Sequence, residues 1–371
     1  MQNDRYLRHS LIDWFSQEEV HNATIAVVGC GAVGNEVAKN LALLGVGKID
    51  LYDFDSIEIH NLTRSVLFRE SDIGQNKAVV AAKQIKELNP DVLVNAFSGD
   101  FWDTMSLEQA NNYSCIISCV DNFEARIRLN QLCLLTSTNF INTGIDSKYG
   151  QVEVFPFASQ QKTACYECNL PSSAYSRIQQ RYSCGWLKKI SYIEKKIPTT
   201  IVTSSTSASL AVANALKLIG KPRDHQSRRI LIDTFTGTST VTQLESNHMC
   251  PGCSSLGSKV SIIKGLALIE DKLDLPMKQE ITIITSDPIL VSYRCVECNP
   301  KDEDATIVFE RAHDYTSDLT KCKKCHLDTV RINITDSFAV NTLLSDMNGK
   351  EIPAKFLHFN LEDEIFIIDL E

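Results

Sequence analysis

The sequence has no long apolar run and no excess of positive charge. None of its stretches approaches the roughly 18 uninterrupted apolar residues of a membrane-spanning helix. Its 37 Lys and Arg stand against 46 Asp and Glu, for a net charge of −9, whereas phosphate backbones are bound by clustered Lys and Arg. The opening MQNDRYLRHS is polar, unlike a secretory signal. We therefore expect a cytoplasmic protein with no membrane span and no nucleic acid as its main partner.

A disulfide framework is not indicated either, although the chain has 13 cysteines. Eight of them fall in four C-x-x-C pairs, and the others lie mostly in apolar runs. That distribution favours zinc in a reducing compartment over disulfides. With 371 residues, 43% of them hydrophobic, the chain is long enough for a large core and a smaller second module.

The segment from Thr24 to Lys77 predicts one βαβ unit. Ile25–Val28 is a short apolar run rich in β-branched residues, and Gly29, Gly31 and Gly34 follow it with G-x-G-x-x-G spacing. This spacing lets the backbone turn tightly and approach a phosphate chain at a helix N-terminus. By itself the motif suits a dinucleotide dehydrogenase as well as an ATP enzyme.

The continuation of the unit separates these two possibilities. The second predicted strand, residues 49–52, ends at Asp53, nineteen residues beyond the last glycine, where an acidic residue usually binds ribose hydroxyls. Beyond it lie Asn61, Arg64 and Lys77. Positive charge at this place would serve a triphosphate, and a nicotinamide site has no evident use for it. We therefore predict an ATP site.

At these residues the sequence resembles the ThiF/MoeB and ubiquitin-activating enzyme superfamily, which adenylates the C-terminal carboxylate of small β-grasp proteins. The opening RYLRH and the run CIISCVDN match it as well, and the resemblance covers roughly residues 1–255. It implies ATP, Mg²⁺ and zinc as cofactors and a homodimer as the assembly. The residue roles that it implies are phosphate contact across the dimer by Arg5, ribose binding by Asp53, triphosphate binding by Asn61, Arg64 and Lys77, and magnesium binding by Asp121.

The remaining periodicity predicts an α/β fold, a Rossmann-like mixed sheet with helices on both faces, over residues 1–257. We predict helices at 77–88, at 124–135 and from near Pro198, and strands at 92–97, 115–120 and 140–143. An antiparallel extension should follow residue 144, and residues 229–244 should form a hairpin turning at Gly237. The run at 254–260 is expected to be a linker to a small α+β module, residues 258–371.

The first two cysteine pairs are Cys165 with Cys168 and Cys250 with Cys253, separated by 81 residues. Four thiolates satisfy tetrahedral zinc, although redox dithiols are the alternative for so wide a separation. The resemblance supports structural zinc, because the superfamily closes its crossover segment with the same two pairs.

The second set lies in the C-terminal module: Cys295 with Cys298, and Cys322 with Cys325, only 23 residues apart. This spacing is a zinc-ribbon signature, and small modules of this length often need a metal to hold them. The module has no evident catalytic residues. We expect it either to dock the carrier protein or a downstream conjugating enzyme, or simply to stabilise the chain.

Cys184 is the cysteine of the expected crossover loop, about residues 169–198, that lies outside the zinc pairs. In the relatives this loop carries the thiol that accepts the activated carboxylate. Arg181, Lys188 and Lys189 would lower the pKa of Cys184 and so favour attack on an acyl-adenylate. The text RYSCGWL lacks the proline-cysteine-threonine pattern of eukaryotic ubiquitin-activating enzymes, and a buried structural thiol is the alternative.

The combined hypothesis is an activating enzyme that adenylates a ubiquitin-like protein and transfers it to Cys184 as a thioester, in a bacterial conjugation pathway. Three alternatives remain at this point. The chain could activate a sulfur carrier for thiamine, molybdopterin or tRNA thiolation. It could modify a ribosomal peptide precursor, or it could be a regulatory subunit that binds without catalysis.

Overall fold

The computed structural model of the chain describes residues 4–159, 163–171, 173, 198–219, 226–254, 259–264, 282–301, 303, 305–314, 321–327, 329–339, 352–361 and 364–370. Contacts between residues divide the chain into two compact units. The first comprises residues 1–170 and 196–254, and the second comprises residues 171–195 and 255–371. The domain boundary at residue 257 stays a prediction.

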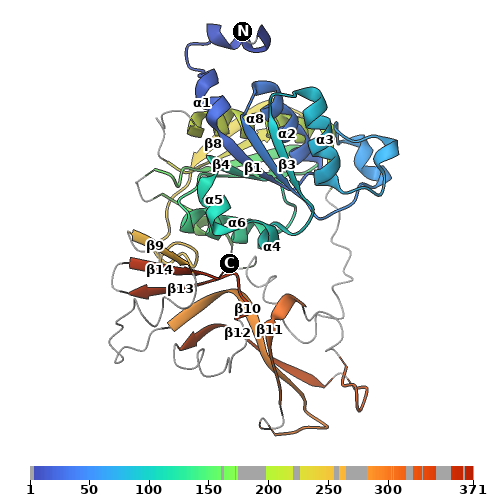
Figure 1. Cartoon of the computed structure of the whole chain (residues 1–371), viewed down its shortest axis with the longest axis vertical. Helices are drawn as coiled ribbons and strands as arrows, with labels where there is room; N and C mark the ends of the chain where they lie inside the picture. The colour runs from blue at the N-terminus through green and yellow to red at the C-terminus, as the bar shows by residue number, and fades with distance from the viewer. Residues whose placement is uncertain are drawn as a thin grey trace. The chain divides into compact units, whose positions relative to one another are not determined.

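The first unit is built on an eight-stranded sheet of order β3-β2-β1-β4-β5-β6-β7-β8 (Figure 1). Strands β1 to β5 pair in parallel, whereas β6, β7 and β8 each run antiparallel to the preceding strand. The strands are β1 Thr24–Val28, β2 Lys48–Tyr52, β3 Leu93–Phe97, β4 Cys115–Ser118, β5 Phe140–Ile145, β6 Tyr149–Phe155, β7 Arg228–Asp233 and β8 Thr238–Gln243.

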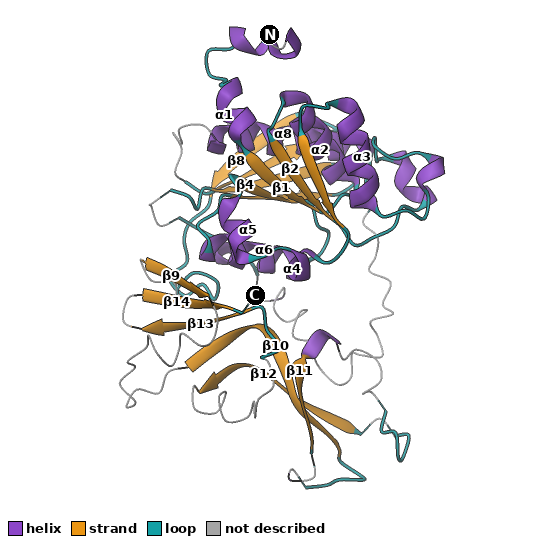
Figure 2. Ribbon diagram, in the orientation of Figure 1, coloured by secondary structure: helices purple, strands orange, loops and turns teal. Residues whose placement is uncertain are grey.

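Helices cover both faces of this sheet, so the predicted fold class is confirmed (Figure 2). One face carries α1 Gln17–Asn22, α2 Ala32–Leu44, α3 Lys77–Leu88 and α8 Ile201–Ile219. The other carries α4 Phe101–Thr104, α5 Leu107–Asn112 and α6 Phe123–Leu135. The short 3₁₀ turns are η1 Asp4–Tyr6, η2 His9–Leu11, η3 Ile59–Thr63, η4 Glu70–Asp72 and η5 Tyr166–Asn169.

The main core lies between the sheet and α2, α3 and α8. Alanines at positions 208, 211 and 215 of α8 are buried at helical spacing, and small side chains let α8 pack closely against α2. Every residue of β4 is buried, as expected for a parallel strand covered on both faces. This rigid central region holds the loops at the carboxyl ends of β1 and β4.

Most of the predicted elements of this unit are present, with corrections at their ends. Helix α3 covers the predicted residues, but β4 ends at Ser118, two residues before the predicted end. The long helix α8 begins at Ile201, close to the predicted start near Pro198, and Thr200 caps it: the Thr203 amide donates to Thr200 Oγ1 at 3.3 Å. The N-terminal arm, residues 4–22, contains two 3₁₀ turns before α1.

The second unit contains a six-stranded sheet of order β11-β10-β13-β14-β9, with β12 also paired to β10. Its elements are β9 Lys259–Lys264, β10 Thr282–Cys295, β11 Thr306–Arg311, η7 Ala312–Asp314, β12 Val330–Ala339, β13 Phe356–Leu361 and β14 Glu364–Asp369. The linker prediction is wrong at its end, because Lys259 and Val260 begin β9 and pair in parallel with β14.

The strand order of the first unit reverses between β1 and β4. The chain passes from β1 to β2 and β3 on one side, then returns to place β4 on the other side of β1. In open α/β sheets, ligands bind beyond the carboxyl ends of the strands at such a switch point. Val28 pairs with Ser118, so the loops after β1 and β4 lie side by side there.

We predict that Gly34→Ala destabilises the first unit and that Gly31→Ala does not. A Cβ at Gly34 would lie 1.8 Å from the Gly29 carbonyl oxygen, whereas one at Gly31 would meet nothing within 4 Å. Overpacking of this kind typically costs about 1–3 kcal/mol. Chemical denaturation should therefore show a lower midpoint for Gly34→Ala alone. Equal midpoints for the two variants would contradict the close packing of α2 on the glycine turn.

Candidate functional site

The glycine turn joins β1 to α2 at the switch point. Gly29 has φ +90°, and a Cβ there would lie 2.7 Å from the Cys119 carbonyl oxygen, so conformation and space both require glycine. Gly31 precedes the first residue of α2 and lies against open space. The turn therefore leaves room beside the unpaired amides of a helix N-terminus, an arrangement that favours an anion.

Asp53 follows β2 and reaches the glycine turn. The Cys30 amide donates to Asp53 Oδ2 at 2.6 Å, and the Asp55 amide donates to Asp53 Oδ1 at 2.8 Å. Burial raises the pKa of the Asp53 carboxyl, while the hydrogen bond from Cys30 and the charge of Lys77 act in the opposite direction. The predicted ribose acid thus lies directly beside the predicted phosphate turn.

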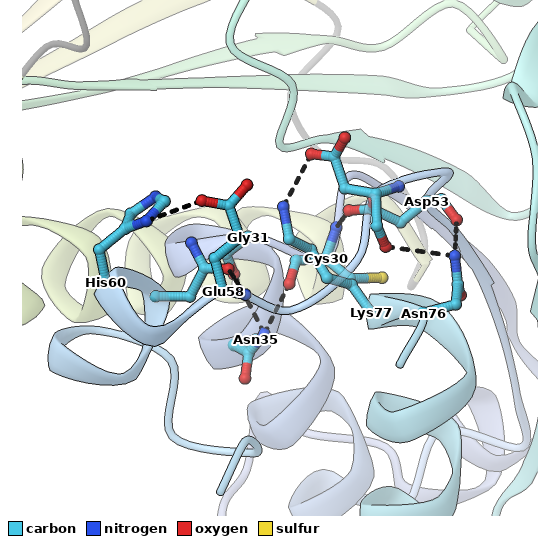
Figure 3. Close-up of polar contacts among 10 residues, drawn as sticks. Cys30, Gly31, Asn35, Asp53, Glu58, His60, Asn76 and Lys77 are labelled. Atoms are coloured by element: carbon cyan, nitrogen blue, oxygen red, sulfur yellow. Dashed lines mark hydrogen bonds and ion pairs between the residues drawn. The ribbon is translucent and has the colours of Figure 1, made fainter. Parts of the chain in front are cut away.

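Lys77 begins α3 next to this acid (Figure 3). Its ammonium lies 2.7 Å from Asp55 Oδ2, and its amide donates to the Asp55 carbonyl at 2.9 Å. Asn76 caps the helix by accepting from the Val79 amide, and its own amide group donates to the Asp53 carbonyl at 2.9 Å. The loop after β2 and the start of α3 are thereby held together.

Asn61 and Arg64 lie in the same loop, at η3. Asn61 is buried, and its Oδ1 accepts from the Glu58 amide at 2.9 Å. Arg64 is half-buried, and its guanidinium donates to the His60 carbonyl at 2.7 Å. His60 in turn lies 3.0 Å from the carboxylate of Glu58 (Figure 3). The loop therefore presents a fixed polar segment between the glycine turn and α3.

Asn35, Asp55 and Asn76 are site residues that the sequence motifs do not indicate. Asn35 is fully buried: its amide nitrogen donates to the Cys30 carbonyl at 2.6 Å, and its Oδ1 accepts from the Leu67 amide at 2.9 Å. It ties the glycine turn to the loop that carries Arg64. A polar residue on the buried face of a predicted helix is the signal that would have pointed to it.

Asp121 and Arg5 occupy different places. Asp121 is exposed three residues after β4, in the loop whose Cys119 contacts Gly29. Arg5 donates to the Leu88 carbonyl at 3.3 Å, at the opposite end of α3 from Lys77, which is about 17 Å away by helical rise. Within one chain Arg5 is therefore outside the site, and its predicted contact across a dimer stays a prediction.

The first four predicted zinc ligands form one cluster. The Sγ atom of Cys165 lies 3.6 Å from that of Cys250 and 3.8 Å from that of Cys168. The Sγ atoms of Cys168 and Cys253 lie 3.5 Å apart. Tetrahedral zinc with bonds of about 2.3 Å places its sulfurs about 3.8 Å apart. Hydrogen bonds with Cys165 lower the pKa of Cys168 and Cys250. The spacing of the four sulfurs therefore fits a zinc ion.

Buried polar contacts support this first cluster. Glu167 is buried, and its Oε1 accepts from Asn130 at 3.1 Å. A Cβ on Gly252 would lie 2.3 Å from the same oxygen, so the turn between Cys250 and Cys253 packs directly on Glu167.

The other four cysteines form a second cluster at the end of β10. Cys295 lies 3.6 Å from Cys325, and Cys298 lies 3.8 Å from Cys322, measured between Sγ atoms. The amides of Cys298 and Lys324 donate to the sulfurs of Cys295 and Cys322, as in zinc knuckles. In the part of the chain that the structure describes, these two quartets are the groups suited to a metal. Cys184 lies outside the described residues.

The family model described as the ThiF family matches residues 4–254, well over half of the chain. The chain belongs to the ThiF family. The match spans the glycine turn, Asp53, Lys77, Asp121 and the first cysteine cluster. The predicted family is thereby confirmed.

Curated relatives of this ThiF-family chain are named "Ubiquitin-like modifier-activating enzyme 5". The Arabidopsis thaliana protein is 29% identical over 230 residues, which cover 57% of this chain and 50% of that protein. The Drosophila willistoni protein is 28% identical over 320 residues, covering 81% and 73%. The chain thus spans between half and about three quarters of the length of these relatives.

Solved structures of E. coli MccB are similar in fold to this chain. The crystal structure of MccB with ATP has a TM-score of 0.55 and 26% identity, covering 68% of this chain and 74% of MccB. The structure with AMPCPP and MccA has a TM-score of 0.56 at the same identity, covering 68% and 75%.

Among the described helices of this ThiF-family chain, none has the length and apolarity to span a membrane.

We predict two zinc ions per chain, one in each cluster. Elemental mass spectrometry of the purified protein should give about two zinc per chain, and Cys168→Ser and Cys298→Ser should each lose one, because three thiolates hold zinc less tightly than four. Cys115→Ala removes a buried thiol outside both clusters and should retain both ions. Protein that retains two zinc ions in the Ser variants, or none in the parent, would contradict the assignment.

Proposed function

We propose that the chain is an ATP-dependent adenylating enzyme that activates the C-terminal carboxylate of a small ubiquitin-like protein with a flexible tail. The observation that carries this proposal is the meeting of the glycine turn, Asp53 and Lys77 at the switch point of a ThiF-family fold. The names of the curated relatives and the crystal structure of MccB with ATP support it.

In this proposal the nucleotide lies across the ends of β1 and β2. The amides at Gly31 and the start of α2 bind phosphate oxygens, and Asp53 accepts hydrogen bonds from the ribose hydroxyls. Asn61, Arg64 and Lys77 bind the triphosphate. Arg5 would reach the same phosphates from the partner subunit of a homodimer.

Asp121 has the chemistry of a magnesium ligand. Mg²⁺ is usually held by one or two carboxylates together with substrate phosphates, and an exposed carboxylate at the carboxyl end of a central strand fits that need. When bound, the ion would neutralise phosphate charge. The residues of the chain itself do the positioning.

The first step forms a bond from a carboxylate oxygen of the carrier protein to the α-phosphorus of ATP. The bond from that phosphorus to the oxygen shared with the β-phosphate breaks, and pyrophosphate leaves with the electron pair. Arg64 and Lys77 stabilise the charge that develops on the phosphates. In the second step the Cys184 thiolate attacks the acyl carbon and AMP leaves, so that a thioester forms.

The zinc sites and domains complete the proposal. Residues 1–257 would form the adenylation domain and residues 258–371 a small zinc-binding module that docks the carrier or a conjugating enzyme. A cytoplasmic, bacterial conjugation pathway would use the thioester.

A second candidate is modification of a ribosomal peptide. MccB has been solved in complex with MccA and with its isoasparagine form, and it shares 25–26% identity with this chain. The nucleotide chemistry would be the same, and the activated carboxylate would belong to a peptide instead of a folded carrier.

The adenylation step is tested by exchange of labelled pyrophosphate into ATP, with the small-protein fraction of the host as the source of carrier. Lys77→Ala and Asp121→Ala should lower the rate by about 100-fold or more, because both act on transition-state charge. Lys83→Ala removes an exposed lysine from the same helix and should exchange at the parent rate. Full activity in Asp121→Ala or Lys77→Ala would disprove the role proposed for that residue, and a parent that shows no exchange would disprove the adenylation assignment.

The acceptor step is tested by intact mass under non-reducing conditions after addition of MgATP to enzyme in its host extract. The parent should gain a thiol-sensitive adduct of small-protein mass, and Cys184→Ala should not. An adduct in both proteins would show that Cys184 is not the acceptor. A peptide-sized adenylated product released from both would favour the MccB-like reaction.

A further inference from the structure

We propose that Asp55 is a positioning residue that competes with polyphosphate for Lys77, and that its carboxylate recaptures the ammonium as pyrophosphate leaves. This inference rests on the proposed function, since it takes Lys77 to bind the triphosphate. It concerns an acid that lies in the site and that neither the sequence motifs nor the adenylation chemistry uses.

Lys77 lies where a cation is unfavourable. It occupies the first residue of α3, where the helix dipole is positive. Its side chain is only 11% exposed, so water hydrates the ammonium poorly. A cation at such a place needs an anion, and Asp55 at 2.7 Å supplies it.

The two partners of this ion pair differ in exposure to water. The Asp55 side chain is 53% exposed, so its carboxylate can return to water at low cost, whereas Lys77 cannot. An incoming phosphate would therefore replace Asp55 as the partner of Lys77. The lysine itself would need to move little.

Asp55 stays close to Lys77 when its carboxylate is displaced. Its amide donates to Asp53 Oδ1 at 2.8 Å, and its carbonyl accepts from the Lys77 amide at 2.9 Å. Asn76 donates to the same carbonyl at 3.3 Å. The backbone thus keeps the carboxylate within a few ångströms of any phosphate on Lys77, and the two like charges repel.

The effect of Asp55 on binding depends on whether the ligand carries phosphate. Repulsion from Asp55 weakens the binding of ATP and pyrophosphate but not of adenosine, which carries no phosphate. Product release benefits, because the departing pyrophosphate leaves behind an ammonium that already has a nearby counter-ion. Asp55 would therefore exchange some nucleotide affinity for faster turnover.

The test is calorimetric titration of purified parent, Asp55→Asn and Asp55→Glu with magnesium pyrophosphate, MgATP and adenosine. Asp55→Asn removes the charge and keeps the shape, so it should bind pyrophosphate and ATP about tenfold more tightly. Its adenosine affinity should equal that of the parent. Asp55→Glu keeps the negative charge and should therefore bind all three ligands with parental affinity.

Glu70→Gln is the matched control, because it removes an exposed carboxylate from the same loop. It should bind all three ligands as the parent does. Unchanged or weaker pyrophosphate binding by Asp55→Asn, or a parallel change in adenosine binding, would overturn the inference while leaving the adenylation assignment intact. A folded parent that binds neither MgATP nor pyrophosphate would instead overturn the proposed function.

Discussion

The close packing of α2 on the glycine turn is the constraint on which the site depends. Gly34 has no side chain because the Gly29 carbonyl oxygen occupies that space, and Gly29 itself lies against the loop after β4. The helix N-terminus is therefore held at the switch point between β1 and β4. Asp53 can then reach the Cys30 amide from β2, so one packing contact fixes the relative positions of the glycine turn, Asp53 and the loop of Asp121.

The sequence predicted those parts of the fold that local patterns determine. Helix α3 begins at an asparagine cap and ends before Pro90, and its predicted limits are those of the structure. Strand β9 was missed because its partner β14 lies about a hundred residues away, and only that pairing orders it. A serine- and glycine-containing run gave no local indication of a strand.

The same distinction applies to the site. The glycines and Asp53 have a fixed spacing along the chain, so the sequence indicated them and the structure brings them together. Asn35 and Asp55 act through contacts with other segments: Asn35 binds the Leu67 amide 32 residues away, and Asp55 binds Lys77 22 residues away. No motif spacing expresses such contacts. Arg5 and Cys184 belong to the same class, because their predicted roles need a second chain or a loop outside the described residues.

The site also contains two charged residues, Asp53 and Lys77, that lower the stability of the folded state. Burial raises the pKa of Asp53 in the folded state, so the ionised carboxylate is less favourable there than in the unfolded chain. This term is absent below the ordinary aspartate pKa and is fully present above the raised one. Lys77 adds a cation at a helix N-terminus, which by itself costs about 0.3–1 kcal/mol.

Neither the buried carboxylate of Asp53 nor the cation of Lys77 is needed for packing. Asp55 offsets the cost of the Lys77 cation only from a position in which its own side chain is about half exposed to water. Ribose hydroxyls would donate to Asp53, and phosphates would neutralise Lys77, so one nucleotide would compensate both. A binding site requires residues that are unfavourable in the free protein and that one ligand stabilises together. Residues selected for stability alone would not be arranged in this way.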